Sequence, residues 1–140
     1  MYADYEFYIA EYLGELVSEK EFPKYEVQAR DELDYYTRMR IPYVKDENKM
    51  ERVKMCECKL IDLLFSYDQE IARIREYELK TIDNGVIASE TVGKQSVSYQ
   101  KATLRDVATV EKERDSKVRD IIYKNLAMTG LLYRGVCRVW

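Results

Sequence analysis

The sequence predicts a mainly α-helical protein: a helical bundle with a long central helix and one β-hairpin inserted before the last helix. Apolar residues recur at three- and four-residue steps over long stretches, which is the spacing of one helix face. Residues 86–99 instead alternate between apolar and polar, which is typical of strands. With 140 residues, 46% of them hydrophobic and 35% charged, the chain is expected to form a single domain, 1–140, around one core.

A short first helix is predicted over residues 4–13. Asp4 is of the type that accepts hydrogen bonds from the first free backbone N–H groups of a helix. Gly14 follows at the position that a helix C-terminus favours.

A second helix is predicted over residues 18–39. Ser18 and Glu21 have the spacing of a capping box, and Pro42 is expected to stop the helix. Its apolar stripe consists of Tyr25, Ala29, Leu33 and Tyr36.

The central helix is predicted over residues 49–79, the longest periodic run of the chain. Its apolar face consists of Met50, Val53, Cys56, Leu60, Leu63, Leu64, Tyr67, Ile71 and Ile74. The cluster Asp83, Asn84 and Gly85 is expected to separate this helix from the next element.

The hairpin is predicted over residues 86–99. Val86 and Ala88 alternate with polar residues before the turn, Val97 and Tyr99 do so after it, and Gly93 supplies a residue suited to a tight turn. A lone two-stranded hairpin is marginally stable in water. It is therefore expected to lie on another surface, as an assembly element or as a flap on its own chain.

A last helix is predicted over residues 106–128, with Val118, Ile121, Ile122 and Leu126 on its core face. Residues 111–117 are polar all round, as expected of a solvated face or of a half-helix that lines a wet channel. The tail, 130–140, is apolar and basic, and is either a strap packed on the bundle or a docking peptide for another protein.

The sequence offers little for catalysis. It contains no histidine, the commonest general base, and its glycines are scattered singly, so that no loop could cradle a phosphate. Cys56 and Cys58 lie two residues apart on a helix and therefore point to different faces, which argues against a shared metal. We expect no enzyme, no catalytic residue, no metal site and no cofactor.

Targeting signals and charge bear on the setting of the protein. No signal peptide or membrane span is predicted, and three cysteines suit a reducing cytoplasm. Residues 1–36 carry a net charge of −7 and residues 101–140 one of +4. The two ends can neutralise each other within one fold or can meet head to tail between subunits. The net charge of −3 argues against tight DNA binding.

Several stretches resemble one family. They are the segment IASETVGKQSVSY between the second long helix and the third, the closing TGLLYRGV, and the opening YEFYIAEYLG with FPKYEVQARDELDYYT. In this order they are similar to the head-tail connector (adaptor, or head-completion) proteins of tailed bacteriophages and prophages. The resemblance covers most of the chain, and residues 40–50 and 100–110 carry no part of it.

The resemblance implies a structural virion protein of the head-tail neck, present in the host cytoplasm during assembly. Its subunits would form a dodecameric ring on the portal, give the stopper and tail a platform, and let genomic DNA pass through the lumen without sequence-specific binding. The implied subunit or neck contacts are the hairpin residues Ser89, Glu90, Val92, Gly93, Ser96, Val97 and Tyr99. The implied portal-docking residues are Leu131, Leu132, Tyr133, Arg134, Gly135 and Val136.

Two alternatives remain. The chain could be another phage neck or tail-completion component, such as a stopper, although a stopper is expected to be richer in strands. It could also be a small cytoplasmic helical protein-interaction module.

Overall fold

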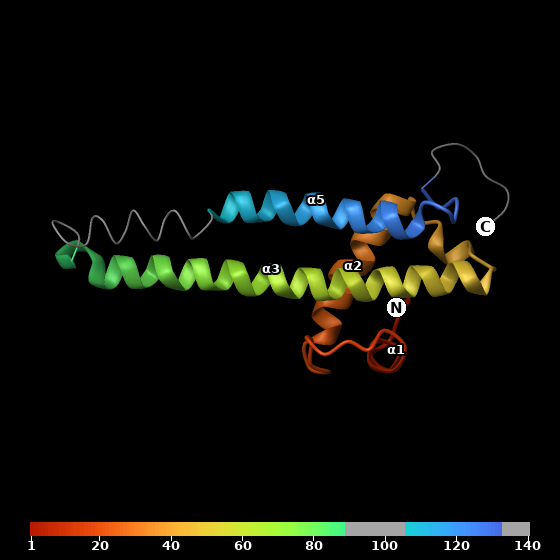
Figure 1. Ribbon diagram of the computed structural model, residues 1–140, viewed down its shortest axis with the longest axis horizontal. Coiled ribbons are helices and arrows are strands. Elements are labelled where there is room, and N and C mark those ends of the chain that lie inside the picture. Colours follow the sequence, from red (N-terminus) through yellow and green to blue (C-terminus); the bar gives the residue numbers. More distant parts are fainter. Residues whose placement is uncertain (89–105, 133–140) are drawn as a thin grey trace. The chain divides into compact units, whose positions relative to one another are not determined.

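The computed structural model describes residues 1–88 and 106–132. In the first of these ranges, side chains are described up to Leu79. The described residues are mainly helical. Helix α1 spans Tyr5–Ala10, α2 Phe22–Thr37, the 3-10 helix η1 Ile41–Tyr43, α3 Glu47–Ala88 and α5 Val107–Leu126 (Figure 1). The predicted helical class is therefore confirmed. No strand occurs within the described ranges.

Helix α1 begins as the sequence predicts. The Asp4 carboxylate accepts a hydrogen bond from the backbone N–H of Phe7 at 2.8 Å. The helix ends at Ala10, three residues before its predicted end, and the left-handed conformation belongs to Leu13, with φ 62°, rather than to Gly14.

The predicted bounds of α2 were wrong at both ends. The Ser18 hydroxyl does accept from the Glu21 N–H, at 3.4 Å, but it caps a turn that leads directly into the helix, which begins at Phe22. The helix stops at Thr37, because Arg38 and Met39 adopt left-handed backbone angles, φ 56° and 61°. The Met39 N–H then donates to the carbonyl of Asp34 at 2.9 Å, which closes the helix end before Pro42 is reached.

Helix α3 is longer than predicted. It continues past 79, through the cluster 83–85, to Ala88, so that residues 86–88 are helical rather than the start of a strand. Adding a residue to an existing helix costs little, and even an interior glycine costs only about 1 kcal/mol, so this cluster did not end the helix. The rest of the predicted hairpin, 89–99, lies outside the described residues.

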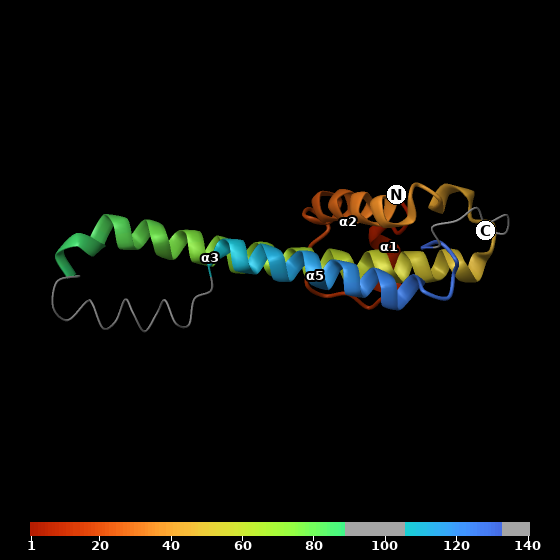
Figure 2. The ribbon, with the colours of Figure 1, turned by 90° about the horizontal axis from the view of Figure 1, so that it is seen from above.

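The chain forms two compact units. The first comprises Met1–Phe65 and Arg114–Trp140, and the second comprises Ser66–Glu113. In the first unit, the last part of α5 runs antiparallel along the first half of α3, and α2 crosses α3 (Figures 1 and 2). The described buried hydrophobic residues of the second unit are Tyr67, Ile71, Ile74 and Val110.

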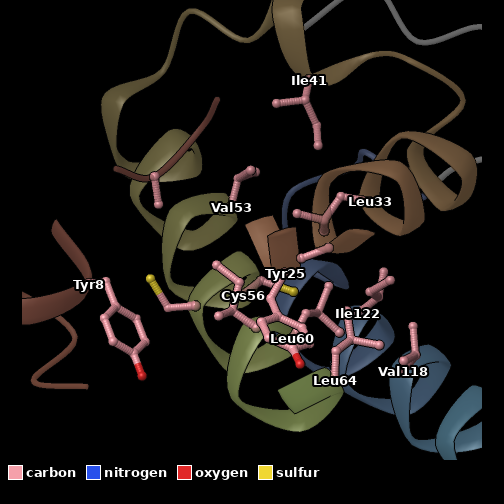
Figure 3. Packing of buried hydrophobic residues seen from close by; sticks show 14 of the residues in the cluster. Tyr8, Tyr25, Leu33, Ile41, Val53, Cys56, Leu60, Leu64, Val118 and Ile122 are labelled. Atoms are coloured by element: carbon pink, nitrogen blue, oxygen red, sulfur yellow. The ribbon is translucent and has the colours of Figure 1, made fainter. Parts of the chain in front are cut away.

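The core of the first unit unites the three predicted stripes. Figure 3 shows Tyr25 and Leu33 of α2 facing Cys56, Leu60 and Leu64 of α3, with side chains of α5 beside them. The buried residues of α5 are Val118, Ile122 and Leu126. These stripes are the part of the prediction that positions the helices. Within the described ranges, no helix is both long and apolar enough to cross a bilayer.

Candidate interaction surfaces

A groove in the first unit is lined by aromatic side chains, and we call it the tyrosine groove. It has a volume of about 340 Å³ and is lined by Tyr35, Tyr36, Arg38, Tyr123 and Leu132. The left-handed turn at Arg38, which ends α2, brings the arginine next to the two preceding tyrosines. The groove thus joins the end of α2, the outer face of α5 and the first residues of the tail.

The rings of the tyrosine groove support one another. Tyr35 and Tyr36 pack edge to face with centroids 5.1 Å apart, and Tyr36 packs the same way on Tyr123 at 6.0 Å. Tyr35 is nevertheless 75% exposed, so that most of this side chain faces solvent. Edge-to-face aromatic pairs hold a fixed geometry, and exposed tyrosines of this kind are common at protein contacts.

The electrostatics of the groove are mixed. Partial burial raises the pKa of Tyr36, the charge of Glu32 raises it further, and the charge of Arg119 lowers it. Among the described residues of the lining, Arg38 carries the positive charge. Aromatic rings beside an arginine are common in contacts between proteins.

A second exposed surface, the α1 loop surface, is formed by α1 and the residues that follow it. Ile9, Leu13 and Leu16 are 43%, 74% and 54% exposed. Exposed carboxylates surround these apolar side chains: Glu6, Glu11, Glu15 and Glu19. Apolar side chains rimmed by charge are the usual make-up of a contact patch.

Buried hydrogen bonds fix the α1 loop surface to α3. The hydroxyls of Tyr8 and Tyr12 donate to the two carboxylate oxygens of Asp62, at 2.6 and 2.9 Å. The Tyr8 hydroxyl also accepts from the backbone N–H of Val17 at 3.1 Å. Burial and the bond to Asp62 raise the pKa of Tyr8 to about 12, so this hydroxyl keeps its proton and remains a donor at neutral pH.

Gly14 lies directly against the Tyr8 ring. A Cβ atom at position 14 would lie 2.3 Å from the Tyr8 Cζ atom, far inside van der Waals contact. The sequence suggested a helix-ending glycine here, whereas its actual role is to let the backbone approach a buried ring.

Two buried carboxyl groups of the same unit were not anticipated from the sequence. Glu26 of α2 and Glu57 of α3 are 1% and 0% exposed, and each has one oxygen without a hydrogen-bond partner. Glu57 Oε1 accepts from the Ala3 N–H at 3.2 Å, and Arg30 Nε lies 3.8 Å from Glu26 Oε1. Burial, followed by the charge of Glu26, raises the pKa of Glu57 to about 8.

The two carboxyl groups lie away from the tyrosine groove. Neither Glu26 nor Glu57 lines the tyrosine groove, and Glu57 instead binds the backbone near the start of the chain. Glu26 directly follows Tyr25, and Glu57 directly follows Cys56, each a residue of a predicted apolar stripe. Both glutamates therefore lie at the border of the apolar face rather than on it. Helical periodicity alone assigns such neighbours to either face.

The predicted docking residues fall into two groups. Leu131 is fully buried in the core cluster and Leu132 lines the tyrosine groove. The remaining four, Tyr133, Arg134, Gly135 and Val136, lie outside the described residues, as do all seven predicted hairpin contacts, from Ser89 to Tyr99.

Hydrogen bonds after α5 explain the burial of Leu131. The Thr129 hydroxyl donates to the Leu126 carbonyl at 2.6 Å and accepts from the Leu131 N–H at 3.3 Å. Gly130 between them has φ 79°, which glycine adopts without strain. The start of the tail is therefore a strap on this chain's own core, which was one of the two alternatives.

Cys56 and Cys58 of α3 belong to the buried core cluster. Cys56 and Cys58 are free thiols, and burial raises the pKa of each to about 12. Over the side chains that the structure describes, no three His, Cys, Asp or Glu residues gather in a way that could hold a metal ion.

Comparison with known proteins adds no assignment. No family model, curated protein or solved structure matches this chain.

The tyrosine groove was missed by sequence reasoning, although a signal for it exists. Tyr35 lies off the stripe of α2, and Tyr123 lies off the core face of α5. A large aromatic residue off the apolar face of a helix is expected to be exposed. Which helices would bring such residues together depends on tertiary packing, which the helical spacing does not specify.

Proposed function

We propose that this chain is a structural, non-enzymatic virion protein that forms a ring between the portal and the tail of a tailed bacteriophage. In this role it completes the head, extends the DNA channel and provides a platform for the stopper and tail. The observation that carries the proposal is the exposed tyrosine groove beside the root of the tail. The resemblance of the hairpin stretch and of TGLLYRGV to connector proteins supplies the phage setting.

The burial of the strap narrows the docking segment. Leu131 holds the tail root in the core, and Leu132 lines the groove with Tyr35 and Tyr123. A portal would therefore bind the tail from Tyr133 onward. The hairpin stretch, with Val97 and Tyr99, would contact a neighbouring subunit or the next ring.

Electron microscopy of the protein mixed with the portal protein of the same phage tests this function. We expect rings on the portal vertex, and shielding of Val97 and Tyr99 from solvent only after assembly. A protein that stays monomeric with its portal at high concentration contradicts the proposal.

Truncation of the tail tests the docking segment. Deletion of residues 133–140 should abolish portal binding and leave far-UV helicity unchanged, because Leu131 and its strap are retained. Substitution Leu79→Asn is the control, since Leu79 is an exposed side chain of α3 outside the proposed contacts. Unchanged portal binding after the truncation would remove the tail from the interface.

The alternative function, a small helical protein-interaction module, is favoured by the same groove, whose chemistry does not require a phage partner. The neighbouring genes distinguish the two functions. Genes for a portal or a major capsid protein favour the connector.

A further inference from the structure

We infer that copies of this chain associate head to tail, with the α1 loop surface of one copy seated in the tyrosine groove of the next. This inference rests on the proposed ring and names the two surfaces that would build it. It commits to a second copy of the chain as the occupant of the groove.

Leu13 is the feature that points to a contact at the α1 loop surface. Its backbone is left-handed, with φ 62°, a conformation that is strained for a leucine. Its side chain is also 74% exposed, so burial of the leucine does not compensate for this strain. The loop is held in place by Tyr12, which binds Asp62, and by Gly14 against the Tyr8 ring.

The two surfaces complement each other in chemistry. Leu13 offers an apolar side chain flanked by Glu11 and Glu15, which are exposed. The groove offers aromatic rings with Arg38 in its lining and Arg119 near Tyr36. Seating the leucine between the rings would bring carboxylates towards arginines.

The charged residues of α2 and α5 near the groove include both acidic and basic side chains. Glu32 of α2 acts on Tyr36 with the opposite sign to Arg119, and burial raises the pKa of Glu32. Arg114 and Asp115 of α5 in turn act on Glu32 with opposite signs. Among the described residues, Arg38 places a positive charge in the lining itself.

The placement of the surfaces suits a contact between copies. Within the first unit, α1 lies on one side of α3, whereas α5 and the end of α2 lie on the other (Figure 1). Because Asp62 of α3 binds Tyr8 and Tyr12, the α1 loop surface is fixed away from the groove of its own chain. Two different surfaces that meet between identical copies form a heterologous contact, which closes into a ring when the rotation allows.

Leu13→Asn tests the contact in the full-length protein. Asparagine tolerates left-handed backbone angles, so the fold should keep its melting temperature while the apolar contact is lost. We expect self-association, measured by sedimentation velocity with and without portal, to weaken about tenfold or more. Leu79→Asn, at 62% exposure and outside both surfaces, should leave it unchanged.

A charge exchange provides a second, independent measurement. Glu11→Arg and Arg38→Glu should each weaken self-association, and the double variant should restore a good part of it. Circular dichroism melts of each variant separate a lost contact from a lost fold. If both single variants self-associate as strongly as the wild-type protein, the inference is overturned.

The outcomes separate this contact from the proposed function. Portal-bound rings that are insensitive to Leu13→Asn overturn the head-to-tail contact and leave the connector function standing. Leu13-dependent association without portal binding supports the contact and contradicts the connector function. The groove could instead be occupied by the tail of its own chain. In that case deletion of residues 133–140 strengthens self-association and Leu13→Asn has no effect on it. This pair of results also overturns the inference. A wild-type protein that never associates overturns both.

Discussion

Gly14 lies so close to the Tyr8 ring that an added Cβ atom would overlap it. A methyl group at position 14 would meet a ring that is fully buried and bonded through its hydroxyl to Asp62 and Val17. We expect Gly14→Ala to lower the free energy of unfolding by about 1–3 kcal/mol, the usual cost of overpacking. Urea titration followed by circular dichroism measures it.

Gly130→Ala is the matched control for Gly14→Ala. Gly130 has nothing within 4 Å of an added Cβ, so alanine there meets only the strain of φ 79°. That strain costs about 1–2 kcal/mol for a residue other than glycine. The steric account is contradicted if Gly14→Ala changes neither stability nor the environment of Tyr8 in NMR spectra.

The buried Glu57 makes stability depend on pH. The folded protein keeps this proton up to a pKa of about 8, whereas the ordinary pKa of a glutamate carboxyl is 4.5. The folded state therefore binds more protons between these values, and the free energy of unfolding falls as pH rises from about 5 to about 8. This contribution is fully present below the lower value and lost above the upper one.

Glu57→Gln should flatten that pH dependence. The amide cannot ionise, so between pH 5 and pH 8.5 the free energy of unfolding of the variant should fall by a few kcal/mol less than that of wild type, the scale of a pKa raised from its ordinary value to about 8. Glu51→Gln, at an exposed position of α3, should keep the wild-type slope. Parallel slopes for wild type and Glu57→Gln contradict a proton held at Glu57.

At the scale of elements, the strap after α5 yields a prediction about stability. Leu131→Ala should destabilise the protein by about 2–5 kcal/mol, because the leucine is fully buried and a cavity would remain. Deletion of residues 133–140 should leave the melting temperature within a few degrees of wild type. A thermal melt of both variants locates the boundary between strap and tail.

Helix faces could be predicted from the sequence far better than helix ends. Tyr25, Ala29 and Leu33 of the predicted α2 stripe are buried as expected, because a 3.6-residue period reports which side of a helix is apolar. Tyr36, the fourth member of that stripe, is only partly buried and lines the tyrosine groove. The ends depend on local backbone conformations that residue type does not fix. Arg38 and Met39 adopt left-handed angles usually left to glycine, and α3 continues through Gly85, a glycine expected to end it.

The whole molecule consists of two units with different buried content. The first contains residues from α1, α2, α3 and α5 in one cluster, whereas the described buried hydrophobic residues of the second come from α3 and α5 alone. In hydrogen exchange, amides of α3 before Phe65 should exchange at least about tenfold more slowly than those between Ser66 and Leu79. Uniform protection along α3 contradicts two units of different local stability.

Sequence patterns predicted the helix stripes of the core, but they did not predict the core positions of Tyr8, Phe22 and Leu131 or the surfaces by which the chain would act. The tyrosine groove needs Tyr36 and Tyr123, 87 positions apart, to meet at the crossing of two helices. The α1 loop surface depends on Asp62 holding two tyrosine hydroxyls, and a single aspartate within an apolar run gives no sign of that. Both features arise from tertiary packing, which a local period does not encode.

The close approach of Gly14 to Tyr8 also has an evolutionary consequence. Substitutions at position 14 would be removed by selection on folding, whatever the protein binds, because the volume is already taken by the ring. Among diverged descendants of this chain, an unchanging glycine at 14 would record packing. Selection on binding would act one residue earlier, at Leu13, whose side chain faces solvent. The residue type at position 13 could therefore change together with the surface of a binding partner.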